Sequence, residues 1–234
     1  MSGDRAPLGV LLDLDDTLYP QAEFLAQTWT AVAAAGAELG LDGPALRAAL
    51  HRAAGAGSDR GGLIDAALAE LGADPASAPA LVGVFRAFRP TRLTPYPGVA
   101  ERLAALAALV PVVLITDGNP DQQRAKLAAT GLGPALRAVV CTDEPHGRGH
   151  RKPHPSGFLH GLALLGCPAE DAVMLGDRPE KDVAGAQALG IRALRVRQGE
   201  YADRPDPDGL WRSAASTAEA LDLLIALCTP GAAR

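Results

Sequence analysis

An apolar run that ends in three carboxylates constrains the fold of this chain more than any other feature. It extends from Val10 to Leu18, with the sequence Val-Leu-Leu-Asp-Leu-Asp-Asp-Thr-Leu. A short apolar run bounded by turn signals is typical of a buried strand in a parallel sheet. The strand must end at Asp13, Asp15 and Asp16, because burying an unpaired charge is very costly. In α/β proteins, this end of a strand is where ligands bind.

The spacing of the acids has two interpretations. Asp13 and Asp15 are two residues apart, so their side chains point the same way on an extended chain. Two neighbouring carboxylates need a counter-ion, and Mg²⁺ prefers such hard oxygen ligands. The alternative is a solvated acidic turn after the strand, and this segment alone does not separate the two.

A helical block follows the acidic turn. Its Ala-rich segments have helical spacing, and no strand pattern interrupts them as far as about residue 89. The predicted helices are 22–36, 44–54, 62–71 and 78–88. A purely helical insertion after the first strand predicts a cap domain over residues 20–92. The core domain would then consist of residues 1–19 and 93–234.

The second half of the chain alternates helices and strands. The predicted strands, with the first included, are 8–14, 112–116, 137–141, 172–175 and 191–196. The predicted helices are 99–109, 120–130, 155–165, 181–189 and 216–227. Repeated βα units indicate an α/β fold with a doubly wound parallel sheet. Arg192 and Arg195 alternate with apolar residues, which predicts that the last strand lies at an edge of the sheet.

Charge and composition exclude several classes of partner. The formal net charge of −5 argues against a nucleic acid or an acidic membrane surface as the main partner. No apolar run approaches the length of a membrane span, and the N-terminal residues have no apolar signal core. Cys141, Cys167 and Cys228 are odd in number and lack metal-ligand spacing, so we expect reduced thiols in a cytoplasmic protein.

Thr116 ends a second predicted strand, just before a glycine turn and a helix start. A hydroxyl and free backbone N–H groups at a helix start form an anion site. Asn119 ahead of Pro120 also has the pattern of a helix N-cap, and both interpretations can hold at once.

A second acidic turn follows the strand 172–175. Asp177 would lie at the carboxyl end of its strand, as Asp13 does, and would add a third carboxylate to a Mg²⁺ site. Asp182 belongs to the same turn, or it is a helix N-terminal acid favoured by the helix dipole.

Lys152 lies in the segment Arg-Lys-Pro-His-Pro, between a short strand and a helix. Most lysines in such loops are solvated. However, Lys126, Lys152 and Lys181 are the only lysines in a chain that otherwise uses arginine, and prolines stiffen the backbone after Lys152. A compact ammonium suits the neutralisation of a carboxylate or a phosphate at short range.

Three histidines, His146, His150 and His154, are spaced by four. This spacing aligns metal ligands on a helix, but the glycines and prolines between them preclude a helix here. We therefore expect a solvated, pH-sensitive loop rather than a zinc site.

In their order and spacing, these segments resemble the four motifs of the haloacid dehalogenase (HAD) superfamily. The matching residues are Asp13 and Asp15 for the first motif, Thr116 for the second, Lys152 for the third, and Asp177 and Asp182 for the fourth. The resemblance implies a Rossmann-like HAD core, with a helical C1 cap inserted after the first strand.

The resemblance also implies roles for the acids. Asp13 would be the nucleophile that forms an aspartyl phosphate. Asp15 would be the general acid for the leaving alkoxide and then the base for the hydrolytic water. Mg²⁺ would be held by Asp13, the main-chain carbonyl of Asp15, and Asp177. Asp16 stands where many members have glycine, and we expect it not to be catalytic. Asp182 would orient Lys152 or a water bound to Mg²⁺.

The remaining implied site residues bind the substrate. Thr116 and the amide of Gly118 or Asn119 would bind phosphoryl oxygens. Asp117 lies in the same segment and is predicted to belong to the substrate-binding site. Lys152 would balance charge between the nucleophile and the phosphate.

An aspartate two residues after the nucleophile, which true dehalogenases lack, favours a phosphatase. We therefore expect a Mg²⁺-dependent phosphomonoester hydrolase, monomeric or homodimeric, that acts on a small phosphorylated metabolite. Residues 116–127 are similar to sugar-phosphate and nucleotide phosphatases, whereas residues 13–20 are similar to pyrimidine nucleotidases, so the substrate stays open. The alternatives are a phosphomutase of the same fold and, in a different class, a non-catalytic HAD-fold or receiver-like signalling protein.

Overall fold

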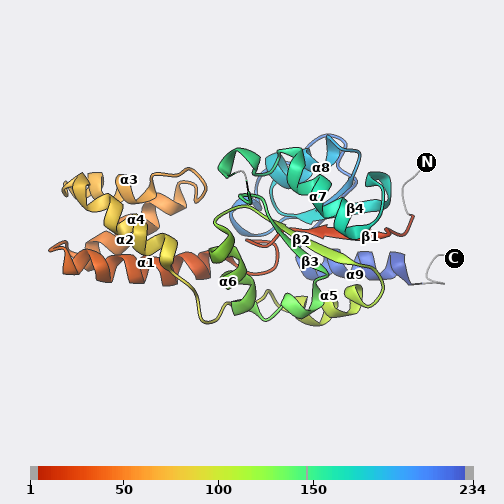
Figure 1. The fold of residues 1–234 in the computed structure, drawn as a ribbon, viewed down its shortest axis with the longest axis horizontal. Helices are drawn as coiled ribbons and strands as arrows, with labels where there is room; N and C mark the ends of the chain where they lie inside the picture. Colours follow the sequence, from red (N-terminus) through yellow and green to blue (C-terminus); the bar gives the residue numbers. More distant parts are fainter. Residues whose placement is uncertain (1–4, 146, 230–234) are drawn as a thin grey trace. The chain divides into compact units, whose positions relative to one another are not determined.

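The computed structural model describes residues 5–145 and 147–229, and it divides them into two compact units. One unit joins the N-terminal segment up to Gln21 with the chain from Arg92 onward, and the other is Ala22–Thr91. The sequence pattern places these boundaries after residues 19 and 92. Figure 1 draws the second unit in orange and yellow.

A six-stranded parallel sheet forms the centre of the first unit, with the strand order β3-β2-β1-β4-β5-β6. The strands are β1 (Gly9–Leu12), β2 (Val112–Thr116), β3 (Ala138–Cys141), β4 (Ala172–Gly176), β5 (Arg192–Val196) and β6 (Arg212–Ala214). β1 is fully buried and pairs with β2 on one side and β4 on the other. The chain order reverses between β1 and β4, which is the switch point at which doubly wound sheets bind ligands.

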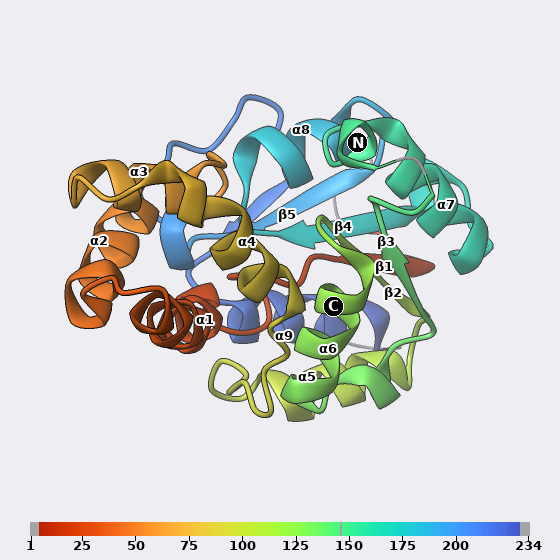
Figure 2. The same cartoon turned by 60° about the vertical axis from the view of Figure 1, so that its left-hand side comes forward.

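Helices cover both faces of this sheet, as Figures 1 and 2 show. The helices of this unit are α5 (Val99–Ala107), α6 (Pro120–Thr130), α7 (Pro155–Leu165), α8 (Ala184–Gln187) and α9 (Thr217–Cys228). α7 and α8 lie on one face, while α5 and α9 pack together on the other. Under α7, the core contains Leu11, Ile115 and Phe158, all fully buried. The predicted α/β fold with a doubly wound parallel sheet is confirmed.

The second unit is helical, as predicted for the insertion. Its helices are α1 (Gln21–Glu38), α2 (Gly43–Gly55), α3 (Leu63–Glu70) and α4 (Ala78–Ala87). Trp29, Leu46, Leu50 and Leu68 form its core, and Trp29 stacks on Phe85 with ring centroids 5.4 Å apart. Each helix therefore turns its apolar stripe inward, which is the pattern that predicted it. Within the described residues, the structure contains no helix long and apolar enough to cross a membrane.

The prediction that strand 191–196 lies at an edge is wrong. β6 pairs with β5 on its outer side, with Leu194 opposite Arg212, so β5 is an interior strand. Arg195 is fully buried, and its guanidinium donates to the Asp206 carboxylate at 2.6 Å and to the carbonyls of Tyr201, Arg204 and Asp177. A buried arginine is tolerated when its N–H groups find such acceptors. The alternation of arginine with apolar residues in this strand therefore does not indicate a solvated face, because Arg195 is buried and hydrogen-bonded.

Close packing of α7 on the sheet depends on Gly161. A Cβ atom at this position would lie 2.7 Å from Leu11 Cδ2 and 2.9 Å from Ile115 Cδ1. We expect Gly161→Val to lower the free energy of unfolding by about 1–3 kcal/mol, because the core must shift to admit the new methyl groups. Urea unfolding measures this loss.

The matched control is Gly83→Val, in the exposed part of α4, where a Cβ would meet nothing within 4 Å. Equal losses in the two variants would show that helix propensity, and not the contact with the sheet, explains the effect.

Candidate active site

The carboxyl ends of β1, β2 and β4 bring the predicted motif residues together. Lys152 is the central group: its ammonium bonds to Asp13, to Asp182 Oδ1 at 2.7 Å and to the carbonyl of Ile115 at 3.1 Å. The Lys152 and Asp182 side chains are each 1% exposed. Burial acts to lower the pKa of Lys152, but the negative charges of its aspartate neighbours outweigh burial and raise it. The lysine is therefore a permanent cation of this site.

Asp13, Asp177 and Asp182 form a group of potential metal ligands, with one oxygen of each within 4.8 Å of the others. The Thr17 hydroxyl lies between two of them, 3.1 Å from Asp13 Oδ2 and 3.4 Å from Asp177 Oδ1. Burial raises the pKa of Asp13 to about 7, despite the opposing charge of Lys152. Burial and the charges of Asp13 and Asp182 also raise the pKa of Asp177. This excess of negative charge fits a bound cation.

Asp182 holds Lys152 in place, which agrees with the role that the resemblance implied. Its second oxygen accepts the backbone N–H of Arg178 at 3.0 Å, so both carboxylate oxygens are engaged. A Cβ at position 176 would lie 2.5 Å from the carboxyl carbon of Asp182, so Gly176 leaves the space that this side chain fills.

The Asp15 side chain is not part of the metal-ligand group of the described residues. Lys126 Nζ contacts its two carboxylate oxygens at 3.0 and 2.9 Å, Gln123 Nε2 donates to it at 3.1 Å, and the Tyr19 hydroxyl donates to it as well. Burial acts to raise the pKa of Asp15, but Lys126 and the other donors outweigh burial and lower it. Metal binding by the main-chain carbonyl of Asp15 stays a prediction.

The side chain of Asp117 is engaged by neighbouring residues, and its predicted part in substrate binding stays a prediction. Its carboxylate accepts hydrogen bonds from the Thr142 hydroxyl at 2.8 Å, the backbone N–H of Lys152 at 3.0 Å and Lys181 Nζ at 3.0 Å. Burial opposes ionisation, but the charges of Lys152 and Lys181 outweigh it and lower the pKa of Asp117. The hydrogen bond from the backbone N–H of Lys152 ties the loop that carries this lysine to Asp117.

Thr116 ends β2, and its hydroxyl oxygen accepts a hydrogen bond from Gln123 Nε2 at 2.5 Å. Asn119 caps α6, because its side-chain oxygen accepts the N–H of Gln122 at 3.1 Å. The N-cap interpretation is therefore confirmed. Binding of phosphoryl oxygens by Thr116 and by the Gly118 or Asn119 amide remains a prediction.

Asp16 lies apart from the metal-ligand group and stabilises the loop around it. Its φ angle is 57°, in the left-handed region that aspartate tolerates better than most residues. Its carboxylate accepts the backbone N–H groups of Gln21 at 2.9 Å and Glu200 at 3.1 Å. These contacts give Asp16 a structural role.

The sequence reasoning missed Gln123, Lys126 and Lys181 as partners of the site. The signal in the sequence was the rarity of lysine, which occurs only three times. In the structure, each lysine bonds to an aspartate of this region: Lys126 to Asp15, Lys152 to Asp13, and Lys181 to Asp117. In a chain whose other basic residues are arginines, every lysine was therefore a candidate.

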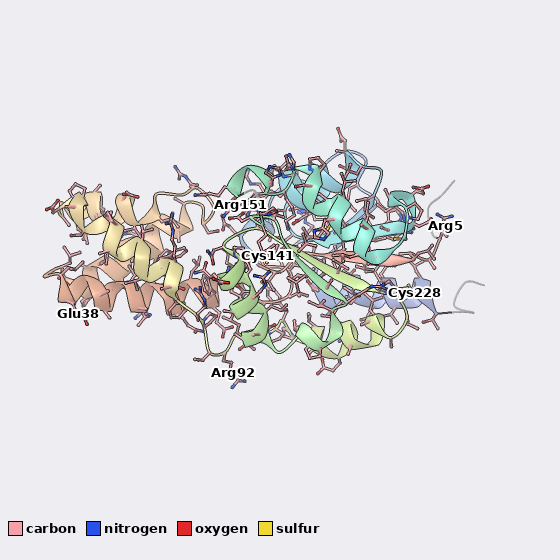
Figure 3. All side chains as sticks on the ribbon, in the orientation of Figure 1. Arg5, Glu38, Arg92, Cys141, Arg151 and Cys228 are labelled. Atoms are coloured by element: carbon pink, nitrogen blue, oxygen red, sulfur yellow. The ribbon has the colours of Figure 1, made fainter. Side chains whose placement is uncertain are left out.

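The histidine loop does not gather a metal site within the described residues. The rings of His150 and His154 lie 4.4 Å apart, and His154 Nδ1 caps the start of α7; His146 lies outside the described residues. Cys141, at the end of β3, and Cys228 are free thiols, as predicted; Figure 3 labels both, together with Arg151, the neighbour of Lys152.

Comparison with known proteins agrees with this geometry. The sequence model of the family described as "haloacid dehalogenase-like hydrolase" matches residues 8–190. The chain belongs to this family. It is 33% identical over 208 residues to the glyceraldehyde 3-phosphate phosphatase of Methanocaldococcus jannaschii, covering 86% of this chain and 89% of that protein. It is also 37% identical over 156 residues to the phosphoserine phosphatase of Thermus thermophilus, covering 66% and 61% of the two chains.

Solved structures of HAD hydrolases share the fold. The HAD-hydrolase YfnB of Bacillus subtilis, in a form bound to magnesium, superposes with a TM-score of 0.67 at 20% identity and covers 94% of this chain and 99% of its own. The predicted class, a HAD-superfamily hydrolase of the phosphatase branch, is confirmed by the family match and the named relatives.

Proposed function

We propose that this HAD hydrolase is a Mg²⁺-dependent phosphomonoesterase that acts through an aspartyl phosphate on Asp13. The carrying observation is the arrangement of two aspartates after β1. Asp13 is buried against Lys152, and Asp15 turns to a separate set of donors around Lys126. This arrangement supports Asp13 as the nucleophile and Asp15 as the group that moves protons.

The carboxylates of Asp13 and Asp177 and the main-chain carbonyl of Asp15 would hold Mg²⁺. Their oxygen chemistry fits a hard divalent cation. Burial, together with the neighbouring acids, raises the pKa values of Asp13 and Asp177, and a bound cation would favour their ionised forms. The ion supplies positive charge that lowers the repulsion between an anionic nucleophile and an anionic phosphate.

The proposed reaction has two steps. In the first, a carboxylate oxygen of Asp13 attacks phosphorus, the ester P–O bond breaks, and protonated Asp15 gives its proton to the leaving alkoxide. Lys126 lowers the pKa of Asp15 in the free protein, and the negative charge of a bound phosphate would raise that pKa and favour the protonated form. In the second, the Asp15 carboxylate takes a proton from water as the water oxygen attacks phosphorus, and the bond to Asp13 breaks. The cycle returns Asp15 to its protonated state and releases inorganic phosphate.

Two more groups would stabilise the transferring phosphoryl group. Lys152 neutralises charge beside Asp13, while the Thr116 hydroxyl and the Gly118 or Asn119 amide donate to phosphoryl oxygens. α6 begins directly after this segment, so its dipole also favours an anion there.

For the substrate, we place small sugar phosphates ahead of nucleotides. The support is the relative named glyceraldehyde 3-phosphate phosphatase, which matches most of this chain. The net charge of −5 argues against a nucleic acid or an acidic membrane as the partner, and we propose a small metabolite in the cytoplasm. A monomer or a homodimer is the proposed state of assembly.

The test is phosphate release from a panel of monoesters in the presence of Mg²⁺: glyceraldehyde 3-phosphate, phosphoserine, hexose phosphates and nucleoside monophosphates, with 2-chloropropionate as the haloacid control. We expect turnover of at least one ester, loss of activity with EDTA, and recovery with excess Mg²⁺. Release of chloride without release of phosphate would contradict the proposal. An isomeric phosphate ester, seen by ³¹P NMR in place of free phosphate, would instead indicate a mutase.

A further inference from the structure

We propose that Gln123 and Lys126 are positioning residues, which hold the Asp15 carboxylate in a fixed position relative to the Thr116 hydroxyl for proton transfer. This inference rests on the proposed phosphatase function. Neither residue belongs to the four motifs. Both act through other groups: Lys126 through Asp15, and Gln123 through Asp15 and Thr116.

The placement of α6 makes this connection possible. α6 starts four residues after Thr116, so it is attached to the strand that presents the hydroxyl. Gln123 and Lys126 are three residues apart and share one face of the helix. That face points into the protein, because the two residues are only 2% and 4% exposed. The helix therefore carries two long polar side chains inward to the segment that follows β1.

Gln123 joins three parts of the site. Its Nε2 lies 3.1 Å from Asp15 Oδ2 and 2.5 Å from Thr116 Oγ1. Its side chain also packs on the loop before α6, since a Cβ on Gly118 would lie 3.3 Å from Gln123 Cδ. One amide thus spans the proton-transfer carboxylate and the proposed phosphate-binding hydroxyl.

Lys126 fixes the plane of the Asp15 carboxylate. Its ammonium contacts the two oxygens at 3.0 and 2.9 Å, with Gln123 on one oxygen and the Tyr19 hydroxyl on the other. Donors on both oxygens oppose rotation of the carboxylate about its side-chain bond. Both reaction steps need this orientation, because Asp15 must reach first the leaving oxygen and then the attacking water.

Stability alone does not account for a lysine at this position. Buried lysines are rare, and an apolar residue of similar size often serves a fold as well as a buried ion pair does. The same helix carries a pair of the ordinary kind, since Arg124 bonds to Glu144 with both side chains about half exposed. The pair between the buried Lys126 and the partly buried Asp15 is therefore the one on α6 that calls for a functional reason.

The experiment compares two esters in Lys126→Met and in Gln123→Leu. An alkyl phosphate from the panel needs protonation of its leaving alkoxide, whereas p-nitrophenyl phosphate releases a phenolate that is stable without a proton. We expect kcat/KM for the alkyl ester to fall about 10²-fold, the cost of a misplaced catalytic group, and kcat/KM for p-nitrophenyl phosphate to fall far less. Asp15→Asn is the reference and should show the same substrate-dependent ratio.

Two further variants make the test selective. Arg124→Met, on the exposed face of the same helix, should leave kcat/KM for both esters unchanged. Lys126→Arg keeps the charge and should restore part of the alkyl-ester activity that Lys126→Met loses. Gln123→Leu leaves no charge unpaired, so it tests the inference even if Lys126→Met does not fold.

The failures are distinguishable. An equal fall on both esters, or no fall on either, would overturn the positioning roles while leaving the phosphatase function intact. A wild-type protein that hydrolyses neither ester with Mg²⁺ present would instead overturn the proposed function.

Discussion

Replacing Asp13 with Asn should lower kcat by at least about 10⁴-fold, because the amide oxygen is a far weaker nucleophile and forms no stable acyl phosphate. The substitution changes charge but hardly changes volume, so the buried site keeps its packing. Asn also retains an oxygen that accepts from Lys152. Steady-state phosphate release measures the loss, and a thermal unfolding curve checks that the fold persists.

Acid quenching of a reaction with labelled substrate gives a second reading of the Asp13→Asn variant. Wild type should retain covalent label and the variant should not. Asp16→Asn is the matched control in the same segment, since the Asp16 carboxylate accepts the backbone N–H groups of Gln21 and Glu200 and Asn tolerates its left-handed backbone. Phosphatase activity that survives in Asp13→Asn would require a different nucleophile.

Replacing Lys152 with Met should damage both activity and stability. Loss of the ammonium removes the charge beside the nucleophile and should lower kcat by about 10²–10³-fold. It also leaves Asp13 and Asp182 buried without this partner, which should cost about 3–5 kcal/mol of unfolding free energy at neutral pH. Phosphate release and urea unfolding, the latter in metal-free buffer, measure the two effects separately.

The stability deficit of Lys152→Met should grow with pH. Without the lysine, the folded-state pKa of Asp13, already raised to about 7 by burial, rises further above the unfolded value of about 3.9. An acid whose pKa is raised by folding loses stability as the pH increases through that interval. The deficit should therefore be smaller at pH 5 than at pH 7.5.

Arg102→Met, which breaks an exposed pair with Asp222, is the control for Lys152→Met and should cost only about 0–1 kcal/mol at either pH. A pH-independent deficit in Lys152→Met would show that packing, and not unpaired charge, explains its instability.

Much of the fold follows from local patterns in the chain. The strand 112–116 and the helices 120–130 and 155–165 were predicted with the bounds that the structure shows, because apolar periodicity and proline or asparagine caps act over a few residues. The motif residues could also be predicted from the sequence, since acids and hydroxyls directly after a buried apolar strand must lie at the carboxyl edge of the sheet.

The strand β6 and the burial of Arg195 could not be predicted from local sequence patterns. Arg212 and Ser213 are exposed, so this three-residue strand has no apolar pattern of its own. It exists because β5 offers an unpaired edge, and it turns β5 into an interior strand. The acceptors that satisfy Arg195 come from the segment between these two strands and from Asp177, and they meet only after the chain has folded.

The sequence by itself determined the α/β order, the helical insertion and the positions of Asp13, Asp15, Thr116, Lys152 and Asp177. It also showed that lysine is rare here, but not which acid each lysine meets. Only the tertiary structure decided that Lys126 reaches Asp15 while Lys152 reaches Asp13. The physical reason is that ion-pair partners more than a hundred residues apart in the chain are chosen by strand order and by the inward face of α6. Local periodicity carries no information about either.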